Sequence, residues 1–439
     1  MNDARVALFA SHILERQQKT ETVLSATEFN SLLVYSGTPL RYFADDQDAP
    51  FHTFPHFAHF VPLYEPGNFL LVRQGKKPLL IRVKPDDYWH EQAPLGEPFW
   101  LSQFEYSEVK SEDDAWKEIA PLITGKKIAC IGEVHAFTSH GIDTSSINPT
   151  SVLSQLNVNR SIKTSYEVFC LEEANRIAAA GHKSAQEAFL RGESELNIHN
   201  AYMDAVNVVE RELPYETIVA LNEKGAILHY QGKRRDVRNG ASLLLDAGAS
   251  YLGYASDVTR TYVASHADSL FIELLQGVEK LQQELCVLVK PGFSFTDFQK
   301  ETHLKIGNLL FTLGILTVDG KEAVELGLTK VFFPHGVGHM LGLQVHDVGG
   351  KQKPSEGETE LSEKSPLRTD RTMEVGQVFT IEPGVYFIEM LLRPHRGGTL
   401  SVNFNWEHID RLAQYGGVRI EDDVLVTENG IRNLTREYL

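Results

Sequence analysis

The sequence predicts an α+β fold in which a smaller N-terminal α/β domain precedes a larger second domain. Three observations predict this fold. The 439 residues suit two or three domains. Short apolar runs bounded by turn residues indicate strands, and the second half adds long amphipathic helical patterns between Gly-rich turns. A polar stretch at 157–164 separates the two regions, so we expect domains at 1–157 and 165–439.

The first domain is predicted from four short apolar runs that are typical of strands: 32–35, 69–72, 78–83 and 128–131. The second and third runs are joined by a segment that contains Gly75 and two lysines, which favours a β-hairpin. Segment 111–123 opens with Ser, Glu and Asp, residues that suit the first turn of a helix.

The second domain is predicted to contain three long helices. Apolar residues from Leu171 to Phe189 recur on one helical face, with charged residues between them. Two further helices are expected at 269–288, where Lys290-Pro291-Gly292 follows, and at 296–313. The segment 350–369 is polar and carries two prolines, which is typical of a long surface loop.

The composition excludes several classes of partner. Acidic residues outnumber basic ones, 59 against 42, and the formal charge of −17 argues against nucleic acid and anionic membranes as main partners. No apolar run approaches the roughly 18 residues of a membrane span, and residues 1–17 lack the apolar core of a signal peptide. Three scattered cysteines without CxxC spacing suit buried thiols in a reducing compartment. We therefore expect a cytoplasmic protein.

Two aspartates in neighbouring apolar runs form the first candidate site. Asp246 ends the run Leu243-Leu244-Leu245, and Asp257 lies inside the next run. If these runs form a hairpin, the two carboxylates could face each other across it. The turn would be centred near Tyr251 and Leu252, which are poor turn residues, so a longer or bulged connection is expected. Two strand-end aspartates bonded to turn amides would explain the same pattern.

Three histidines within twelve residues form the second candidate site. His335, His339 and His346 alternate with three glycines in this segment. Histidine is the commonest metal ligand among side chains and titrates near neutral pH. Glycine allows the backbone to approach a ligand closely. One such histidine would suit a core, but three in a Gly-rich run favour a site.

Two glutamates complete a set with a specific charge. Glu382 and Glu421 each follow an apolar residue near a predicted strand end, and either alone would suit a solvated carboxylate. Together Asp246, Asp257, Glu382 and Glu421 offer four negative charges, and His339 an imidazole. Four such charges balance two divalent cations. Carboxylate-rich sites suit hard or borderline ions such as manganese or cobalt.

These clusters, in this order, resemble the pita-bread metallopeptidases, a family that includes methionine aminopeptidase, aminopeptidase P and prolidase. The resemblance is closest to bacterial Xaa-Pro dipeptidases, including members that hydrolyse organophosphorus esters. It extends over nearly the whole chain, through segments such as 43–51, 84–90 and 219–223. The resemblance implies a pita-bread second domain and a homodimer built partly by the first domain. It also implies two divalent metal ions, most simply manganese, with cobalt or zinc as alternatives.

The resemblance also assigns the site residues. It implies metal ligands at Asp246, Asp257, His339, Glu382 and Glu421, with His339 preferred to His335 because its spacing to His346 matches the family. It implies catalytic roles for His229, His335, His346 and Glu382. Substrate contacts are implied at Tyr215, Arg368, Arg419 and Asp46, the last lent by a partner subunit.

The predicted reaction is metal-assisted hydrolysis of a dipeptide that ends in proline. A water bridging the two ions would become a hydroxide and attack the scissile carbonyl. His229 and His346 would stabilise the oxyanion, and Glu382 would carry a proton to the proline nitrogen. Arg368 would hold the free carboxylate of the substrate bidentately, although a solvated loop cation would have the same sequence.

Three alternatives remain open at this point. A Xaa-Pro aminopeptidase would use the same ligands on longer peptides. A non-catalytic binding module on the same fold would lack bound metal. Hydrolysis of organophosphorus esters is expected to be incidental, because a site for a tetrahedral carbon intermediate also accepts tetrahedral phosphorus.

Overall fold

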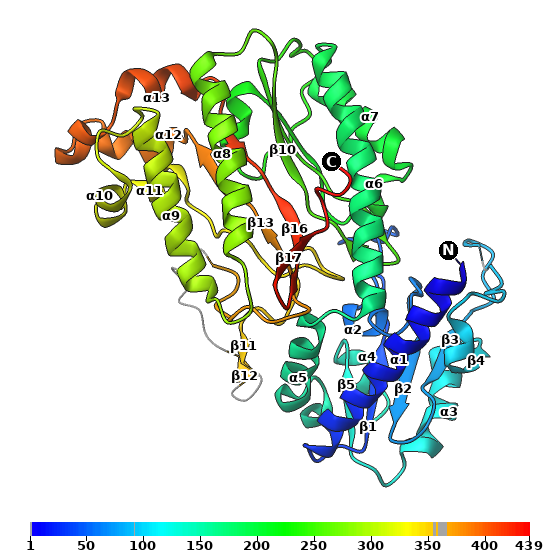
Figure 1. The fold of residues 1–439 in the computed structure, drawn as a ribbon. Helices are drawn as coiled ribbons and strands as arrows, with labels where there is room; N and C mark the ends of the chain where they lie inside the picture. The colour runs from blue at the N-terminus through cyan, green and yellow to red at the C-terminus, as the bar shows by residue number, and fades with distance from the viewer. Residues whose placement is uncertain (1, 92, 354–356, 359–366) are drawn as a thin grey trace. The chain divides into compact units, whose positions relative to one another are not determined.

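The computed structural model describes residues 2–91, 93–353, 357–358 and 367–439. The chain forms two compact units (Figure 1). Of the described residues, the smaller unit holds 2–160, 164–167 and the short strands at 352–353 and 357–358, and the larger unit holds 161–163, 168–351 and 367–439. Both units combine helices with sheets, which confirms the α+β fold.

The smaller unit is built on one five-stranded sheet in the order β4-β3-β2-β1-β5. Neighbours β1 and β2 and neighbours β2 and β3 are antiparallel, whereas β1–β5 and β3–β4 are parallel. Its helices and strands are α1 (Asn2–Ser25), β1 (Ser31–Tyr35), α2 (Pro55–Ala58), β2 (Phe69–Arg73), β3 (Leu79–Val83), β4 (Glu105–Val109), α3 (Glu112–Ile123), β5 (Ile128–Ile131), α4 (His135–Thr138) and α5 (Thr150–Ser161).

Local sequence explains most of this unit. The predicted hairpin is confirmed, and Gly75 takes a positive φ of 65° in the turn between β2 and β3. Ser111 caps α3, because its side chain accepts a hydrogen bond from the amide of Asp114. Trp116 of α3 then packs on Phe69 of the sheet, with 5.8 Å between ring centroids. The first helix, α1, was not predicted, since its charges and apolar residues follow no clean helical period.

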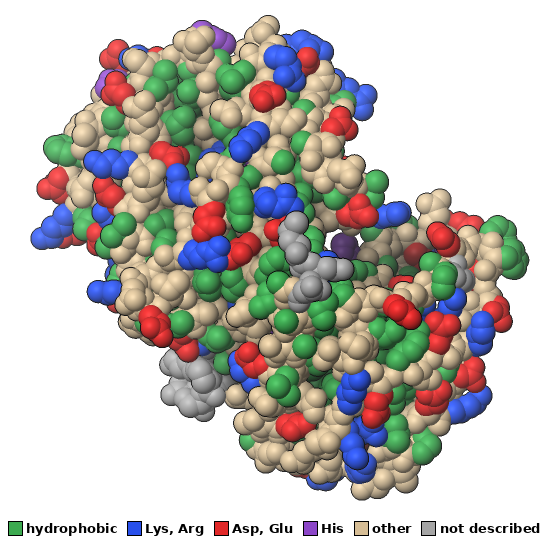
Figure 2. Space-filling model, turned by 45° about the vertical axis from the view of Figure 1, so that its right-hand side comes forward, with side chains coloured by type: hydrophobic (Ala, Val, Ile, Leu, Met, Phe, Trp, Pro, Cys, Tyr) green, Lys and Arg blue, Asp and Glu red, His purple; other side chains and the backbone are tan. Residues whose placement is uncertain are grey.

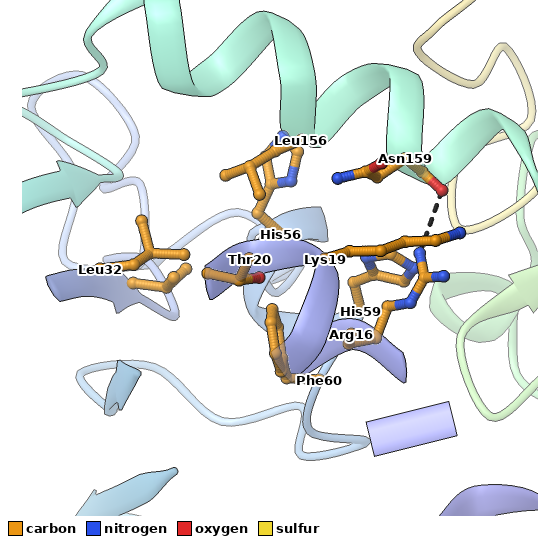
Figure 3. Close-up of a pocket in the computed structure, with 10 residues that line it drawn as sticks. Arg16, Lys19, Thr20, Leu32, His56, His59, Phe60, Leu156 and Asn159 are labelled. Carbon is orange, nitrogen blue, oxygen red and sulfur yellow. Dashed lines mark hydrogen bonds between the residues drawn. The ribbon is translucent and has the colours of Figure 1, made fainter. Parts of the chain in front are cut away.

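The smaller unit encloses a cavity of only about 10 Å³ between α1, β1, α2 and α5 (Figure 3). Arg16 and His59 point into this space, and Arg16 Nη1 donates a hydrogen bond to the carbonyl oxygen of Asn159 at 3.0 Å. A volume of this size accommodates about one water molecule. The cavity is therefore too small for a substrate.

Within the described residues, the larger unit contains four small sheets: β10-β7-β6 and β13-β16-β17 have three strands each, and β14-β15 and β8-β9 have two. The strand pair β11–β12 belongs to the smaller unit. The other elements are α6 (Ser165–Leu190), α7 (Glu195–Val206), β6 (Ile218–Leu221), β7 (Ser242–Asp246), β8 (Ser250–Tyr251), β9 (Tyr254–Ala255), β10 (Thr259–Val263), α8 (Ser269–Leu288), α9 (Phe295–Thr312), α10 (Gly320–Glu325), α11 (Thr329–Phe332), β11 (Gln352–Lys353), β12 (Gly357–Glu358), β13 (Val378–Ile381), β14 (Gly384–Tyr386), α12 (Glu389–Leu392), α13 (Trp406–Ala413), β15 (Gly417–Arg419), β16 (Asp422–Thr427) and β17 (Gly430–Asn433).

The core of this unit lies between the helices α8 and α9 and the strands beside them (Figure 1). Helix α8 contacts α9, β13, β15 and β17. Its apolar face buries Phe271, Leu274, Val278 and Leu285. The predicted helix at 269–288 is confirmed with the same bounds, and the other two predicted helices are confirmed as α6 and α9.

The structure differs from the sequence prediction in the stretch 157–164. It is not wholly a linker, because α5 continues to Ser161 and α6 begins at Ser165. Polar residues such as Asn157 and Arg160 are buried there, and Asn157 Oδ1 lies 2.9 Å from Nε2 of His56. The predicted loop at 350–369 falls mostly outside the described residues, which include its short strands β11 and β12.

Strands β7 and β10 form the antiparallel pair predicted from the two apolar runs. Between them the chain makes a smaller hairpin, β8–β9, whose two turn residues are Leu252 and Gly253. Both have positive φ, 47° and 81°. The expected longer or bulged turn is therefore wrong: the connection is a tight turn, and Leu252 takes a backbone conformation that leucine disfavours.

The strain at Leu252 predicts a difference between two variants. Leu252→Asn and Leu252→Ala both remove the leucine side chain, but asparagine tolerates a positive φ better than alanine. We expect Leu252→Asn to be more stable by about 1 kcal/mol. Urea unfolding of the two variants measures this difference. Equal midpoints, or a more stable alanine variant, would show that the turn relaxes to another conformation.

The surface shows no large area of one charge on the face in Figure 2, where basic and acidic side chains are interspersed. Among the described residues, no helix combines the length and apolar composition that crossing a membrane requires.

Candidate active site

Strand pairing brings three of the predicted ligands together. Asp246, the last residue of β7, lies opposite Thr259, the first residue of β10. The amide of Glu421 donates to the carbonyl of the same Thr259 at 3.0 Å, so Asp246 and Glu421 flank this residue. Asp257 precedes Thr259 by two residues. Side chains two residues apart share a face in extended chain, which directs Asp257 toward the same point.

The other two predicted ligands are placed by β13. The amide of Thr380 donates to the carbonyl of His339 at 3.0 Å, and Glu382 follows the end of this strand. Gly338 makes the close approach possible, because a Cβ atom there would lie 1.9 Å from the carbonyl oxygen of Thr380. Ile381 pairs with Asp422, which brings Glu382 beside Glu421.

All five predicted ligands line one cavity of about 570 Å³ in the larger unit. Ligand atoms of Asp257, His339 and Glu421 lie within 4.8 Å of one another. Nε2 of His339 is 3.4 Å from Oδ2 of Asp257 and 3.7 Å from Oε1 of Glu382. Carboxylates of Asp257, Glu382 and Glu421 therefore lie around one imidazole, and Asp246 lines the same cavity.

The convergence perturbs the protonation of these groups. Burial and neighbouring carboxylates raise the pKa of Glu421 well above its usual value, and burial raises the pKa of Glu382 to about 7. Burial alone would lower the pKa of His339, but Asp257 and Glu382 raise it to about 9. Burial also raises the pKa of Asp246. Without a cation, the cluster therefore holds protons near neutral pH.

These residues fit divalent cations. Nδ1 of His339 donates to the carbonyl of Met340 at 3.1 Å, which leaves Nε2 directed at the carboxylates. Such a bond fixes a ligand imidazole in the required tautomer. Oδ1 of Asp246 is buried and has no hydrogen-bond partner within the described part of the chain. A buried carboxylate oxygen without a partner is costly, and a cation would relieve that cost.

Arg419, predicted to contact substrate, is buried in the wall of the site. Its guanidinium donates to Oδ2 of Asp246 at 2.6 Å, to the hydroxyl of Thr259 at 3.1 Å and to that of Tyr386 at 3.0 Å. It still lines the cavity. Its contacts position Asp246 and supply one positive charge to the carboxylate cluster.

The histidines His229, His335 and His346 all line the cavity. Nε2 of His335 accepts a hydrogen bond from the hydroxyl of Tyr386 at 2.9 Å, and Nδ1 of the same ring donates to the carbonyl of Gly336. Burial lowers the pKa of His335 to about 3, so it is neutral. The ring of His346 meets the edge of the His339 ring at 4.4 Å between centroids, and burial lowers the pKa of His346 to about 4.

Two basic side chains lie at the edge of the cavity. Arg368, which was predicted, and Lys351, which was not, are both exposed and line it. The hydroxyl of Thr369 donates to the carbonyl of Gly350 at 2.6 Å, so the segments that carry the two cations lie side by side. The sequence offered no signal for Lys351, because a lysine after two glycines is typical of any loop.

The remaining predicted contacts, Tyr215 and Asp46, are not among the described residues that line the cavity. The Tyr215 ring packs closely on Gly248, and burial together with Asp246 and Asp257 raises the pKa of its phenol. Tyr215 therefore lies behind the carboxylates. Asp46 is exposed in the smaller unit, where its amide donates to the side chain of Asp45.

Sequence reasoning missed three residues that support the site: Thr259, Tyr386 and Asp423. Thr259 donates its hydroxyl to Oε2 of Glu421 at 2.6 Å, and Oδ2 of Asp423 accepts the amide of Asp257 at 3.1 Å. A signal existed for Asp423, since two aspartates directly after Glu421 are unusual in an apolar strand. Thr259 and Tyr386 could not be told from ordinary strand residues.

Comparison with known proteins places this geometry in a family. The model of metallopeptidase family M24 matches residues 170–428, and that of the Xaa-Pro dipeptidase N-terminal domain matches residues 7–158. The chain belongs to metallopeptidase family M24. It is 40% identical over 437 residues to a Xaa-Pro dipeptidase of Shewanella woodyi, covering 98% of each chain. A Xaa-Pro dipeptidase of Erwinia tasmaniensis is 39% identical over 444 residues, 99% of each.

Solved structures of Escherichia coli aminopeptidase P have the same fold. A zinc-substituted Escherichia coli aminopeptidase P in complex with product aligns with a TM-score of 0.74 at 23% identity, over 98% of this chain and 96% of that chain. A Glu383Ala variant of that aminopeptidase in complex with substrate aligns equally well at 24% identity. The family and this fold confirm a pita-bread metallopeptidase, a hydrolase that binds divalent metal.

Metal binding is expected to release protons. At pH 7 the metal-free protein holds a proton on His339, whose pKa is about 9, and part of one on Glu382, whose pKa is about 7. Because a cation displaces both, together with any proton that the raised pKa of Glu421 retains, we expect release of at least about one proton per chain. The release should shrink from pH 6.5 to pH 8.5, as Glu382 and then His339 lose their protons unaided.

A pH-stat titration of chelator-stripped protein with manganese chloride measures this release. Glu382→Gln is the matched control, since it should remove the part of the release that titrates near pH 7. Release that stays constant across this range would contradict the assignment of its pH-dependent part to Glu382 and His339.

Proposed function

We propose that the protein is a Xaa-Pro dipeptidase that hydrolyses dipeptides with C-terminal proline. The observation that carries the proposal is the 40% identity to a Xaa-Pro dipeptidase over 98% of both chains. The cavity of the larger unit supports it, because the five predicted metal ligands line its buried part and two basic side chains lie exposed at its edge. The basic side chains suit the free carboxylate at one end of a dipeptide.

Asp246, Asp257, His339, Glu382 and Glu421 would hold two divalent cations. Their four carboxylates would balance the four positive charges. When bound, such a pair lowers the pKa of a water molecule and polarises a carbonyl group. We propose manganese as the native metal, since oxygen-rich sites suit hard or borderline ions, with cobalt or zinc as alternatives.

Glu382 would move the proton of the reaction. It lies at the end of β13, with Oε1 3.7 Å from Nε2 of His339 and Oε2 3.6 Å from Nδ1 of His335. A carboxyl group in this position would accept a proton from the attacking water and deliver it to the proline nitrogen. That nitrogen needs the proton because a deprotonated amine is too basic to leave in water.

His229 and His346 would stabilise the negative charge that develops on the carbonyl oxygen. Both line the cavity, and the N–H group of an imidazole can donate a hydrogen bond. His335 would act differently, because its Nδ1–H already donates to Gly336 and its Nε2 accepts from Tyr386. It would shape the wall against which the substrate lies.

Arg368 would recognise the carboxylate of the substrate, with Lys351 beside it. The bond before proline is a tertiary amide, so the enzyme cannot select its substrate through an amide N–H. Selection must use the ring and the free carboxylate, and a guanidinium matches a carboxylate bidentately. Tyr215 would hold the Asp246 and Asp257 side chains, and Arg419 would act through Asp246 as well as on the substrate.

We also propose a cytoplasmic homodimer in which Asp46 of one chain reaches the cavity of the other. This proposal rests on the family resemblance and on the exposure of the loop that carries Asp46. Exposed aromatic side chains accompany it: Phe43, Tyr88 and Trp89 are 101%, 87% and 77% exposed.

The proposed activity is tested by metal removal and restoration. We expect the protein to hydrolyse Ala-Pro, to lose at least about 100-fold in kcat after chelation and dialysis, and to recover when manganese is restored. Release of proline measures the rate. Full activity without cations, or no activity with manganese, cobalt or zinc, would overturn the proposal.

The same preparation separates a dipeptidase from an aminopeptidase. A site that binds the C-terminal carboxylate should hydrolyse Ala-Pro and reject Ala-Pro-Ala. Faster cleavage of the tripeptide would identify an aminopeptidase acting on longer chains.

Arg368 should contribute mainly to substrate binding. Arg368→Ala is expected to raise KM for Ala-Pro by about 10- to 100-fold, because the carboxylate loses a charged hydrogen-bond partner. Arg368→Lys retains the charge without the bidentate geometry and should show a smaller increase. Steady-state kinetics with Ala-Pro and with its proline amide provide the measurement. The amide should be nearly insensitive to both variants, and equal losses on both substrates would remove this role.

A further inference from the structure

A buried ion pair lies directly behind the cavity histidine His346. Nζ of Lys163 is 2.8 Å from Oδ2 of Asp347, the residue that follows His346, and each side chain is only 1% exposed. The two residues are 184 positions apart in sequence. Burying two charges is costly, and it is tolerated only when the geometry of the pair is well defined. The pair therefore holds the backbone beside His346 in one place.

The space for this pair is provided by Gly342. A Cβ atom at position 342 would lie 2.1 Å from Oδ2 of Asp347 and 2.6 Å from Nζ of Lys163. The carbonyl of Gly342 also accepts a hydrogen bond from the amide of Ala255 at 2.9 Å. Gly342 thus packs against the ion pair, and its carbonyl group bonds to the β8–β9 hairpin that precedes Asp257.

Further hydrogen bonds fix both ends of the segment around His346. The amide of Asp347 donates to the carbonyl of Met340 at 2.9 Å, directly after the predicted ligand His339. Beyond His346, buried Arg371 donates to the carbonyl of Gly349 at 3.0 Å and to the hydroxyl of Ser161 at 2.8 Å. The segment between these anchors has His346 on the cavity side and Asp347 on the buried side.

We propose that Lys163 is a positioning residue for His346 and acts through Asp347. The inference rests on the proposed peptidase function. Lys163 is not among the described residues that line the cavity, so its effect on hydrolysis would pass through the loop. With the cation removed, the Asp347 carboxylate would be left buried without its charged partner and would turn toward water. Because His346 is the adjacent residue, its imidazole would move with that change.

The test uses the full-length, manganese-loaded protein with Ala-Pro. Lys163→Met retains the length of the side chain and removes its charge. We expect a fall of about 10- to 100-fold in kcat, with little change in KM or in metal content. Lys305→Met is the matched control, because Lys305 makes an exposed ion pair with Glu284 on the surface of α9. The control should leave all three quantities unchanged.

A double-mutant cycle separates positioning from general stability. In a His346→Ala background, Lys163→Met should add less than about a twofold loss, since the group it positions is already absent. An equal loss in both backgrounds would overturn the inference, and so would a normal kcat in Lys163→Met. If Lys163→Met does not fold, Asp347→Asn, which keeps the shape of the partner, is tested in the same cycle.

A second readout does not depend on catalysis. The histidine ring resonances of the metal-free protein, assigned with His346→Ala, should show the His346 signal shifted or broadened by Lys163→Met, while the signal of buried His182 stays in place. An unchanged His346 signal would overturn the inference. If the wild type shows no hydrolysis of Ala-Pro, the proposed function fails, whereas this spectrum still tests the link between Lys163 and His346.

Discussion

The larger unit depends on one constraint: four carboxylates and an imidazole are buried around a common point. Like charges at this distance repel strongly where water is scarce, and no hydrophobic gain compensates for their burial. The arrangement is tolerable only with cations between the groups or with protons on them. The raised pKa values of Glu382, Glu421 and His339 show that the metal-free cluster retains protons, and bound metal ions would replace those protons.

The rest of the site can be understood as support for this cluster. Arg419 places a positive charge against Asp246, and Thr259 donates to Glu421. Directly behind Glu421, the buried Asp422 accepts from Arg260 at 2.6 Å and from Arg436 at 2.6 Å. Strands β7, β10 and β16 are therefore held by charged contacts, which limits how far Asp246, Asp257 and Glu421 can move apart when no cation is bound.

Local patterns in the sequence predicted much of the fold. The β2–β3 hairpin and helix α8 follow from alternating or periodic apolar residues and from a Gly-containing turn. Helix α1 and the continuation of α5 to Ser161 were missed, because their apolar residues do not follow one face and tertiary packing decides their conformation. Leu252 was judged a poor turn residue, and its positive φ shows that the surrounding strands impose a tight turn on it.

The sequence by itself determined the chemistry of this protein: which carboxylates and histidines are present, in what order, and with what total charge. Only the tertiary structure decided which of them meet. Asp246, His339 and Glu421 are brought together by strand pairing, in which the bridge between Thr259 and Glu421 joins residues 162 positions apart. Lys163 is placed by its ion pair with Asp347, and Lys351 lies next to Gly350, which bonds to Thr369. Local propensity acts over a few residues, whereas burial and pairing act between distant segments, so no reading of the chain could locate those two lysines.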